Sequence, residues 1–231
     1  MLILGLQKTT LLDYPGKVAS TIFTGGCNFR CPYCHNRDLV MPPSDVISYS
    51  SDEIFEHLIQ KKKVLDGVCI TGGEPTLHKD LPEFIAKIKD LGLLVKLDTN
   101  GSNPDMISTL LEQNLIDYIA MDIKHSKEKY NTIACMKNFD ITPFEASVDI
   151  IKNSTINYEF RTTIMKECHN DEDIISIGEW LHGSKAYFLQ SYRESEQVIN
   201  PIFSAHSPEK LKHFVELLKQ YVPNTNLRGV D

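Results

Sequence analysis

The feature that most constrains the fold of this chain is the alternation of short apolar runs with amphipathic stretches of helical length. The apolar runs are nearly continuous and rich in β-branched residues, as in strands that are buried on both faces of a parallel sheet. The predicted strands are residues 18–24, 67–71, 94–98, 118–123, 158–164 and 186–190. Because strand-and-helix units of this kind are joined by right-handed crossovers, the sequence predicts an α/β fold with a parallel sheet or partial barrel.

Several predicted helices begin at recognisable capping residues. Ser50 and Glu53 have the spacing of a capping box. Asp80 is expected to be the N-cap of the next helix, and Ser207 opens the last one. Before the first parallel strand, the Pro–Gly pair within residues 13–17 favours a tight turn. The sequence therefore predicts a short N-terminal hairpin.

Composition limits the class of protein. The chain has 231 residues, 42% of them hydrophobic, and we find no linker or repeat, so we expect a single domain over residues 1–231. The net charge of −7 disfavours nucleic acid as a partner, because phosphate binding relies on clustered Lys and Arg. No apolar run approaches the ~20 residues that cross a bilayer. We expect a cytoplasmic protein without a membrane partner, whose thiols stay reduced.

Polar and glycine-rich residues follow four of the predicted strands. "GGC" follows the first strand, "TGGEPT" the second, "DTNG" the third and "DIK" the fourth. Because the carboxyl ends of parallel strands meet at one edge, ligands gather there in folds of this kind. The sequence predicts a functional site at that edge.

Three of the six cysteines lie close together, at Cys27, Cys31 and Cys34, and the other three are isolated. Structural zinc sites and iron–sulfur clusters both usually take four protein ligands. Three thiolates on a 4Fe–4S cluster would leave one iron open for a substrate or cofactor. Of the isolated cysteines, we expect Cys69 to be a small core residue, and Cys135 and Cys168 to be non-functional thiols.

The spacing Cys27-X3-Cys31-X2-Cys34, with Tyr33 before the last cysteine and "GGEP" after the second strand, resembles the signature of the radical S-adenosylmethionine enzymes. The resemblance covers essentially the whole chain and implies a parallel (βα)6 partial barrel with an N-terminal hairpin. It also implies that the cysteines hold a 4Fe–4S cluster whose open iron binds S-adenosylmethionine. One electron from the cluster then cleaves this cofactor to methionine and a 5′-deoxyadenosyl radical.

The resemblance further implies which residues contact S-adenosylmethionine. The glycines of "GGEP" would let the backbone approach its methionine part, because any Cβ would block that approach. A buried arginine on the fifth strand needs an anionic partner, which the cofactor carboxylate would supply. The implied cofactor-binding residues are Tyr33, Gly72, Gly73, Glu74, Pro75, Asp98, Thr99, Asn100, Lys124, Arg161 and Gln190.

Two aspartates at neighbouring strand ends carry a second expectation. Asp122 and Lys124 in "DIK" resemble a segment of the glycyl-radical-enzyme activases, and Asp98 with Asp122 would bind a monovalent cation, as in some of these activases. The alternative is that the two aspartates serve local turns or pair with Lys124. Gln190 could equally cap its own loop.

Other segments resemble the activases within this family. "DYPG" at residues 13–16 resembles their "DGPG" element near the substrate loop, which places Asp13 among the catalytic residues, although Tyr14 departs from the pattern. "CHN" at residues 34–36 also matches. Several activases carry an eight-cysteine insert before "GGEP". This chain has no cysteine between residues 36 and 68, which argues for a single cluster.

The opening of the chain most resembles the longer activating proteins of anaerobic ribonucleoside-triphosphate reductase. The implied function is to abstract hydrogen from a glycine Cα of a glycyl radical enzyme, which would be that reductase, with flavodoxin or ferredoxin as the electron donor. Two alternatives stay open. One is a radical enzyme that acts on a small molecule, such as a carboxydeazaguanine synthase; the other is a non-catalytic module in which the three cysteines and His35 bind zinc.

Overall fold

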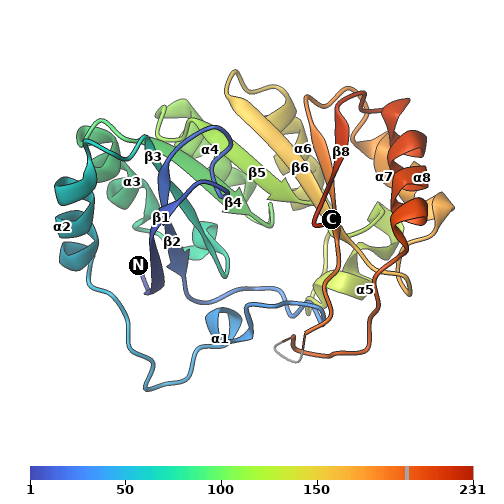
Figure 1. Ribbon diagram of the computed structural model, residues 1–231, viewed down its shortest axis with the longest axis horizontal. Coiled ribbons are helices and arrows are strands. Elements are labelled where there is room, and N and C mark those ends of the chain that lie inside the picture. The colour runs from blue at the N-terminus through green and yellow to red at the C-terminus, as the bar shows by residue number, and fades with distance from the viewer. Residues whose placement is uncertain (196–197, 231) are drawn as a thin grey trace.

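The computed structural model describes residues 1–195 and 198–230 and contains one curved sheet of eight strands (Figure 1). The strands lie in the sheet in the order of the chain, so each new strand is added beside the previous one. β1 pairs antiparallel with β2, and β2 to β8 are parallel. The strands are β1 Ile3–Thr10, β2 Ala19–Thr24, β3 Gly67–Gly72, β4 Leu94–Thr99, β5 Tyr118–Asp122, β6 Asn157–Ile164, β7 Tyr187–Ser191 and β8 Thr225–Arg228.

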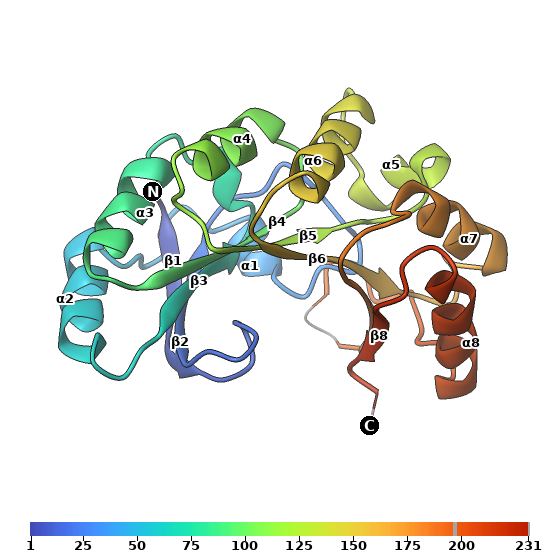
Figure 2. The same ribbon diagram turned by 90° about the horizontal axis from the view of Figure 1, so that it is seen from above.

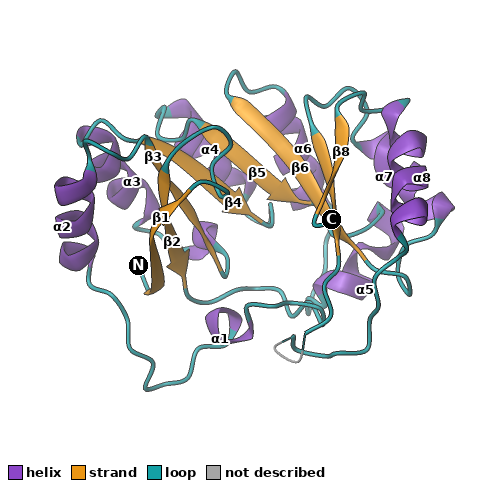
Figure 3. Cartoon of the chain, viewed as in Figure 1, coloured by secondary structure: helices purple, strands orange, loops and turns teal. Residues whose placement is uncertain are grey.

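The larger helices lie on one side of this sheet. Figure 2 shows them in an arc around its convex face, while the concave face opens between the β1–β2 turn and the C-terminal end. Figure 3 shows the helices and the two ends of the strands in the first view. The helices are α1 Arg37–Val40, α2 Ser51–Lys61, α3 Leu81–Asp90, α4 Pro104–Glu112, α5 Tyr130–Ala134, α6 Thr142–Lys152, α7 Asp171–Trp180 and α8 Pro208–Lys219, with the 3-10 turns η1 Pro75–Leu77 and η2 Lys127–Lys129.

The predicted α/β fold is confirmed, and each of the six predicted strands ends within one residue of the observed one. The prediction of six parallel strands is one too few, because β8 follows α8 and pairs with β7. β8 has four residues, "TNLR", and only one of them is apolar. A short edge strand of this kind has no continuous apolar run, so the sequence pattern did not reveal it.

The predicted chain turns and caps are mostly present. The amide of Lys17 donates to the carbonyl of Tyr14 at 3.1 Å, which closes the hairpin turn. Ser50 and Glu53 form the full capping box, and the Ser207 hydroxyl caps α8. Asp80 precedes α3 but its side chain makes no cap hydrogen bond, so its predicted role is wrong. Its carboxylate instead pairs with the N-terminal amine, which is a stronger donor than a backbone amide.

The two faces of the sheet differ in chemistry. On β4, Val95 and Leu97 belong to the apolar core under the helices, whereas Lys96 and Asp98 alternate with them on the concave face. Lys96 is 2% exposed and is therefore buried although it is charged. The strands are buried on both faces, as predicted, but the buried layer on the concave face is polar rather than apolar.

Two glycines allow the loops at the carboxyl edge to pack backbone against backbone. We call residues 25–36 the cysteine loop. Gly73 and Glu74 donate their amides to the carbonyls of Thr24 and Gly26, each at 2.8 Å. A Cβ on Gly73 would lie 2.0 Å from the Gly26 carbonyl oxygen, and Gly72 has φ +114. The Gly–Gly pair thus lets the turn after β3 contact the cysteine loop directly.

A stacked pair of histidines lies behind the same edge. The rings of His125 and His169 are 4.8 Å apart and nearly parallel. His169 is 2% exposed, and its Nδ1 accepts a hydrogen bond from the Met165 amide at 3.2 Å. Burial, with a smaller contribution from the neighbouring His125, lowers the pKa of His169 to about 3. The folded protein therefore holds this imidazole neutral.

No helix among the described residues is both long enough and apolar enough to span a membrane.

The buried imidazole predicts a pH dependence of stability. Below pH ~6.5 His169 is protonated in the unfolded chain, whereas in the folded chain it stays neutral down to about pH 3. The free energy of unfolding therefore falls as pH decreases through this window. We expect His169→Gln to lose less stability than the wild type between pH 7.5 and pH 5 in urea titrations. Equal losses for the two proteins would contradict the assignment.

Gly73→Ala should destabilise the protein by about 1–3 kcal/mol, because the new methyl group would push the cysteine loop away from β3. Gly183→Ala is the matched control, since Gly183 has φ +79 but open space around its Cβ position. The control should cost only the ~1 kcal/mol of a left-handed conformation. Urea unfolding of both variants measures the difference, and equal losses would show that the loop contact is unimportant.

Candidate active site

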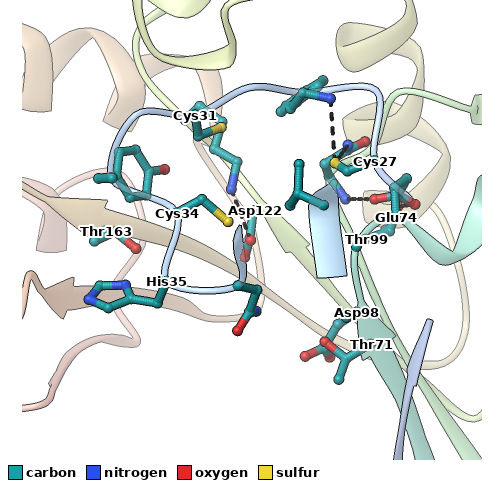
Figure 4. A pocket seen from close by; sticks show the side chains of 18 of the residues that line it. Cys27, Cys31, Cys34, His35, Thr71, Glu74, Asp98, Thr99, Asp122 and Thr163 are labelled. Atoms are coloured by element: carbon teal, nitrogen blue, oxygen red, sulfur yellow. Dashed lines mark hydrogen bonds and ion pairs between the residues drawn. The ribbon is translucent and has the colours of Figure 1, made fainter. Parts of the chain in front are cut away.

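A cavity of about 260 Å³ lies at the carboxyl edge of the sheet, between the strand ends and the cysteine loop (Figure 4). Most of the residues predicted from the sequence line it, although they come from six different strands or loops. The predicted residues in its wall are Cys27, Cys31, Tyr33, Cys34, Gly72, Gly73, Glu74, Asp98, Thr99, Asn100, Asp122, Lys124, Arg161 and Gln190.

Two predicted residues do not line this cavity. The carboxylate of Asp13 accepts a hydrogen bond from the Thr21 hydroxyl at 2.6 Å, half-way along β2. Pro75 is buried and begins the 3-10 turn η1. The cavity also has lining residues that the sequence reasoning missed. These are Phe29, His35 (considered only as a zinc ligand), Asn36, Val40, Thr71 and Thr163.

A periodicity of two would have found two of the missed residues. Thr71 follows Cys69 on β3, and Thr163 follows Arg161 on β6, in each case two positions along the strand. Side chains two apart share one face of a strand. Both threonines therefore belong to the concave face, and Figure 4 shows them beside the cavity.

The three cysteines of the loop suit a cluster of several irons. In the described part of the chain, no three His, Cys, Asp or Glu side chains converge closely enough to share one metal ion. Cys27, Cys31 and Cys34 instead surround a cavity, as a 4Fe–4S cluster requires when each thiolate binds a different iron. Burial raises the pKa of Cys27 to about 11 and that of Cys31 to about 12. Metal binding would supply the positive charge that keeps such thiolates ionised.

His35 is poorly available as a fourth ligand. Its Nε2 lies 2.8 Å from the carbonyl oxygen of Arg193, and its ring packs near that of Tyr192. This nitrogen already has a hydrogen-bond partner outside the cysteine loop. The donor set offered to a cluster is therefore the three thiols.

Glu74 is buried, with 1% of its surface exposed, and its carboxylate is occupied by neighbouring loops. One oxygen accepts from the Thr76 amide and hydroxyl and from the Thr99 hydroxyl, at 2.6–3.1 Å. The other accepts from the Asn100 amide at 2.6 Å. Burial raises the pKa of Glu74, and these donors partly oppose the shift. The carboxylate thus joins the ends of β3 and β4.

A row of alternating charges runs along the concave face beside the cavity, from β4 to β6. Asp98 pairs with Lys96 and, at 3.1 Å, with the Arg161 guanidinium. Arg161 also donates to Asp122 at 2.9 Å, and Asp122 accepts from Lys124 at 3.1 Å. Although burial raises the pKa of Asp122, Arg161 and Lys124 outweigh it and lower that pKa to about 2. Both carboxylates are therefore ionised at neutral pH.

This row of charges bears on the predicted cation site. All four carboxylate oxygens of Asp98 and Asp122 contact Lys96, Arg161 or Lys124. A monovalent cation between these carboxylates would have to share their oxygens with these three cationic side chains. The pairing of Asp122 with Lys124, which was the alternative interpretation, is present; the cation site stays a prediction.

The isolated cysteines lie in different surroundings. Cys69 is fully buried, as predicted for a small core residue, and its Sγ lies on the concave face 3.8 Å from the Lys96 ammonium. Cys135 is exposed with φ 50, and Cys168 is partly buried. Their predicted lack of function stays a prediction.

Comparison with known proteins identifies the family. A model described as the radical SAM superfamily matches residues 21–181. A Methanocaldococcus jannaschii protein named as a glycyl-radical enzyme activating enzyme is 30% identical over all of this chain and 97% of that protein. The pyruvate formate-lyase-activating enzyme of Staphylococcus aureus is 28% identical over 77% of this chain and 74% of its own.

A solved structure shows the same fold. Streptococcus suis SuiB bound to S-adenosylmethionine has a TM-score of 0.69 and 16% identity. It covers 89% of this chain and 49% of that one. Together with the family match and the three thiols around one cavity, these findings show that the chain belongs to the radical S-adenosylmethionine superfamily of enzymes, which use a 4Fe–4S cluster and S-adenosylmethionine.

Proposed function

We propose that this chain is an activating enzyme that removes a hydrogen atom from a glycine Cα of a partner enzyme and leaves a glycyl radical there. The observation that carries this proposal is the likeness to the M. jannaschii activating enzyme, which extends over all of this chain and 97% of that protein. The S. aureus relative, also named as an activating enzyme, supports the same reaction class. We further propose that residues 1–231 act as one domain.

Cys27, Cys31 and Cys34 would hold the 4Fe–4S cluster in this function. The cluster and S-adenosylmethionine together supply a 5′-deoxyadenosyl radical when one electron arrives. The protein contributes orientation and the exclusion of side reactions. Phe29 and Tyr33 are buried to 2% and 6% exposure beside the thiols, so apolar surface closes one side of the cluster site.

The row of charges would orient S-adenosylmethionine. Lys124 and Arg161 line the cavity and are the cations available to its carboxylate. Lys124 also lies 5.9 Å above the Tyr33 ring, which limits where its ammonium can move. Because the Glu74 carboxylate is already saturated by Thr76, Thr99 and Asn100, "GGEP" would bind the cofactor through its backbone.

The concave face offers a route for a partner polypeptide. It opens beside the β1–β2 turn, where Leu11 and Leu12 are 71% and 90% exposed (Figure 2). Asp13 lies in the same turn and is proposed to act on the partner loop rather than on the cofactor.

We propose an anaerobic ribonucleotide reductase as that partner and flavodoxin or ferredoxin as the electron donor. We also propose the cytoplasm as the site of action, since free thiols persist under reducing conditions.

Cys31→Ala should abolish reductive cleavage of S-adenosylmethionine while leaving the fold intact, because Cys31 lies in a loop outside the strands and helices. Cys135→Ala is the matched control, since this cysteine is exposed and isolated. Formation of 5′-deoxyadenosine after anaerobic reconstitution measures cleavage. Cleavage at a near-normal rate by the Cys31 variant would reject the cluster assignment. A colourless reconstituted wild type would instead favour the zinc module.

Mixing the reconstituted protein with an anaerobic ribonucleotide reductase, S-adenosylmethionine and a reductant should give a doublet electron paramagnetic resonance signal. The remaining α-hydrogen of a glycyl radical splits the signal, so deuterated glycine in the partner should collapse the doublet and place deuterium in 5′-deoxyadenosine. Asp13→Asn should reduce the doublet more than it reduces cofactor affinity. Turnover of a small metabolite without any doublet from candidate partners would reject the proposal and favour a small-molecule enzyme.

A further inference from the structure

Asn100 is connected to the cysteine loop by its side chain. Its Nδ2 lies 3.9 Å from Cys27 Sγ and 2.9 Å from Asn28 Oδ1. Asn100 is 6% exposed, so bulk water does not compete for these contacts. The family resemblance implies a contact of this residue with S-adenosylmethionine, and the structure shows a contact with the cysteine loop.

The orientation of the Asn100 amide follows from its other partner. Its Oδ1 accepts a hydrogen bond from the backbone amide of Ser102 at 2.9 Å. A backbone N–H can only donate, so this oxygen cannot exchange places with Nδ2. The NH₂ group is therefore the part of the side chain that faces Cys27.

The surrounding contacts hold the amide in place. Asn28 Nδ2 donates to the Ser102 hydroxyl at 2.9 Å, which closes a ring of three residues with Asn100, in which Ser102 takes part through both its hydroxyl and its backbone amide. The Asn100 backbone amide donates to Glu74 at 2.6 Å. Both N–H bonds of the Asn100 side chain are thus directed, one to Asn28 and one to the Cys27 sulfur.

Cys27 differs from the other two cysteines of the loop. Its Sγ also accepts from the backbone amide of Phe29 at 3.4 Å. Over the ranges 1–195 and 198–230, no hydrogen bond to the Sγ of Cys31 or Cys34 is present. The hydrogen-bond donors therefore converge on one of the three prospective thiolate ligands.

Hydrogen bonds to cluster sulfurs are one of the factors that set the reduction potential of an iron–sulfur centre. An N–H that points at a thiolate stabilises negative charge, and the reduced cluster carries one more negative charge than the oxidised one. A donor to Cys27 therefore makes the cluster easier to reduce. Removing it should favour the oxidised form.

We propose that Asn100 is a positioning residue that raises the reduction potential of the cluster through an N–H···S hydrogen bond to Cys27, with Glu74 and Ser102 fixing its orientation. This inference rests on the proposed function, because it requires the 4Fe–4S cluster. It gives Glu74 a role in electron uptake that does not depend on contact with S-adenosylmethionine.

The test is a redox titration of the reconstituted full-length protein without S-adenosylmethionine or partner. The spectroscopic signal of the reduced cluster measures the fraction that is reduced at each potential. Asn100→Leu removes the donor without adding charge and should shift the reduction equilibrium about tenfold toward the oxidised form, which is 59 mV for a one-electron couple. Asn100→Asp keeps the acceptor for Ser102 but turns a carboxylate toward Cys27, so its shift should be larger and of the same sign.

Ser102→Ala is the matched control. This variant removes the hydroxyl that contacts Asn28 but keeps the Ser102 backbone N–H that orients Asn100. Its cluster should therefore have the same reduction potential as that of the wild type. An unchanged potential in Asn100→Leu, or an equal shift in Ser102→Ala, would overturn the inference. If Asn100→Leu takes up no cluster, Asn100→Ala, which also lacks a side-chain donor, decides by the same criterion.

The failure of the proposed function would look different. A wild type that forms no 4Fe–4S cluster would overturn both proposals. A wild type that forms the cluster and generates a glycyl radical, with the same potential as Asn100→Leu, would overturn this inference alone.

Discussion

The buried carboxylate of Glu74 is the contact on which the edge of the sheet depends. Leaving an ionised carboxylate unpaired at 1% exposure would be costly, so its four donors are a requirement of the fold. These donors come from the turn after β3 and from the end of β4, and they fix Thr99 and Asn100 against Thr76. Because the Glu74 amide also binds Gly26, the same residue secures the cysteine loop.

A second constraint is the charge balance of the concave face. Lys96, Asp98, Arg161, Asp122 and Lys124 alternate in sign, and Glu159 pairs with Arg228 at 2.6 Å farther along the sheet. Buried ions are tolerated only when they are paired and hydrogen-bonded. Two cations of this row, Lys124 and Arg161, line the cavity. An anionic ligand group could bind them there, and its charge would be paired when it leaves water.

The two constraints divide the cavity into two sides. Toward β3 and β4 the side-chain amide of Asn100 faces Cys27, and Gly72 and Gly73 line the cavity. Toward β5 and β6 the charged groups of Lys124 and Arg161 face the remaining space. With the roles proposed above, electron uptake would be tuned on one side of this cavity and S-adenosylmethionine would be oriented on the other.

The sequence by itself determined six of the seven parallel strands, the cysteine loop and most residues of the cavity wall. Continuous apolar runs and the Cys-X3-Cys-X2-Cys spacing are local patterns that can be read along the sequence. Because the strands are parallel, the loops that follow them all lie at one edge of the sheet. The tertiary structure decided the contacts between distant residues. Gly73 meets Gly26, Arg161 bridges Asp98 and Asp122, and the Asn100 amide turns to Cys27. These contacts join positions 39–73 residues apart, so they depend on strand register and on the packing of separate loops, which local sequence patterns do not encode.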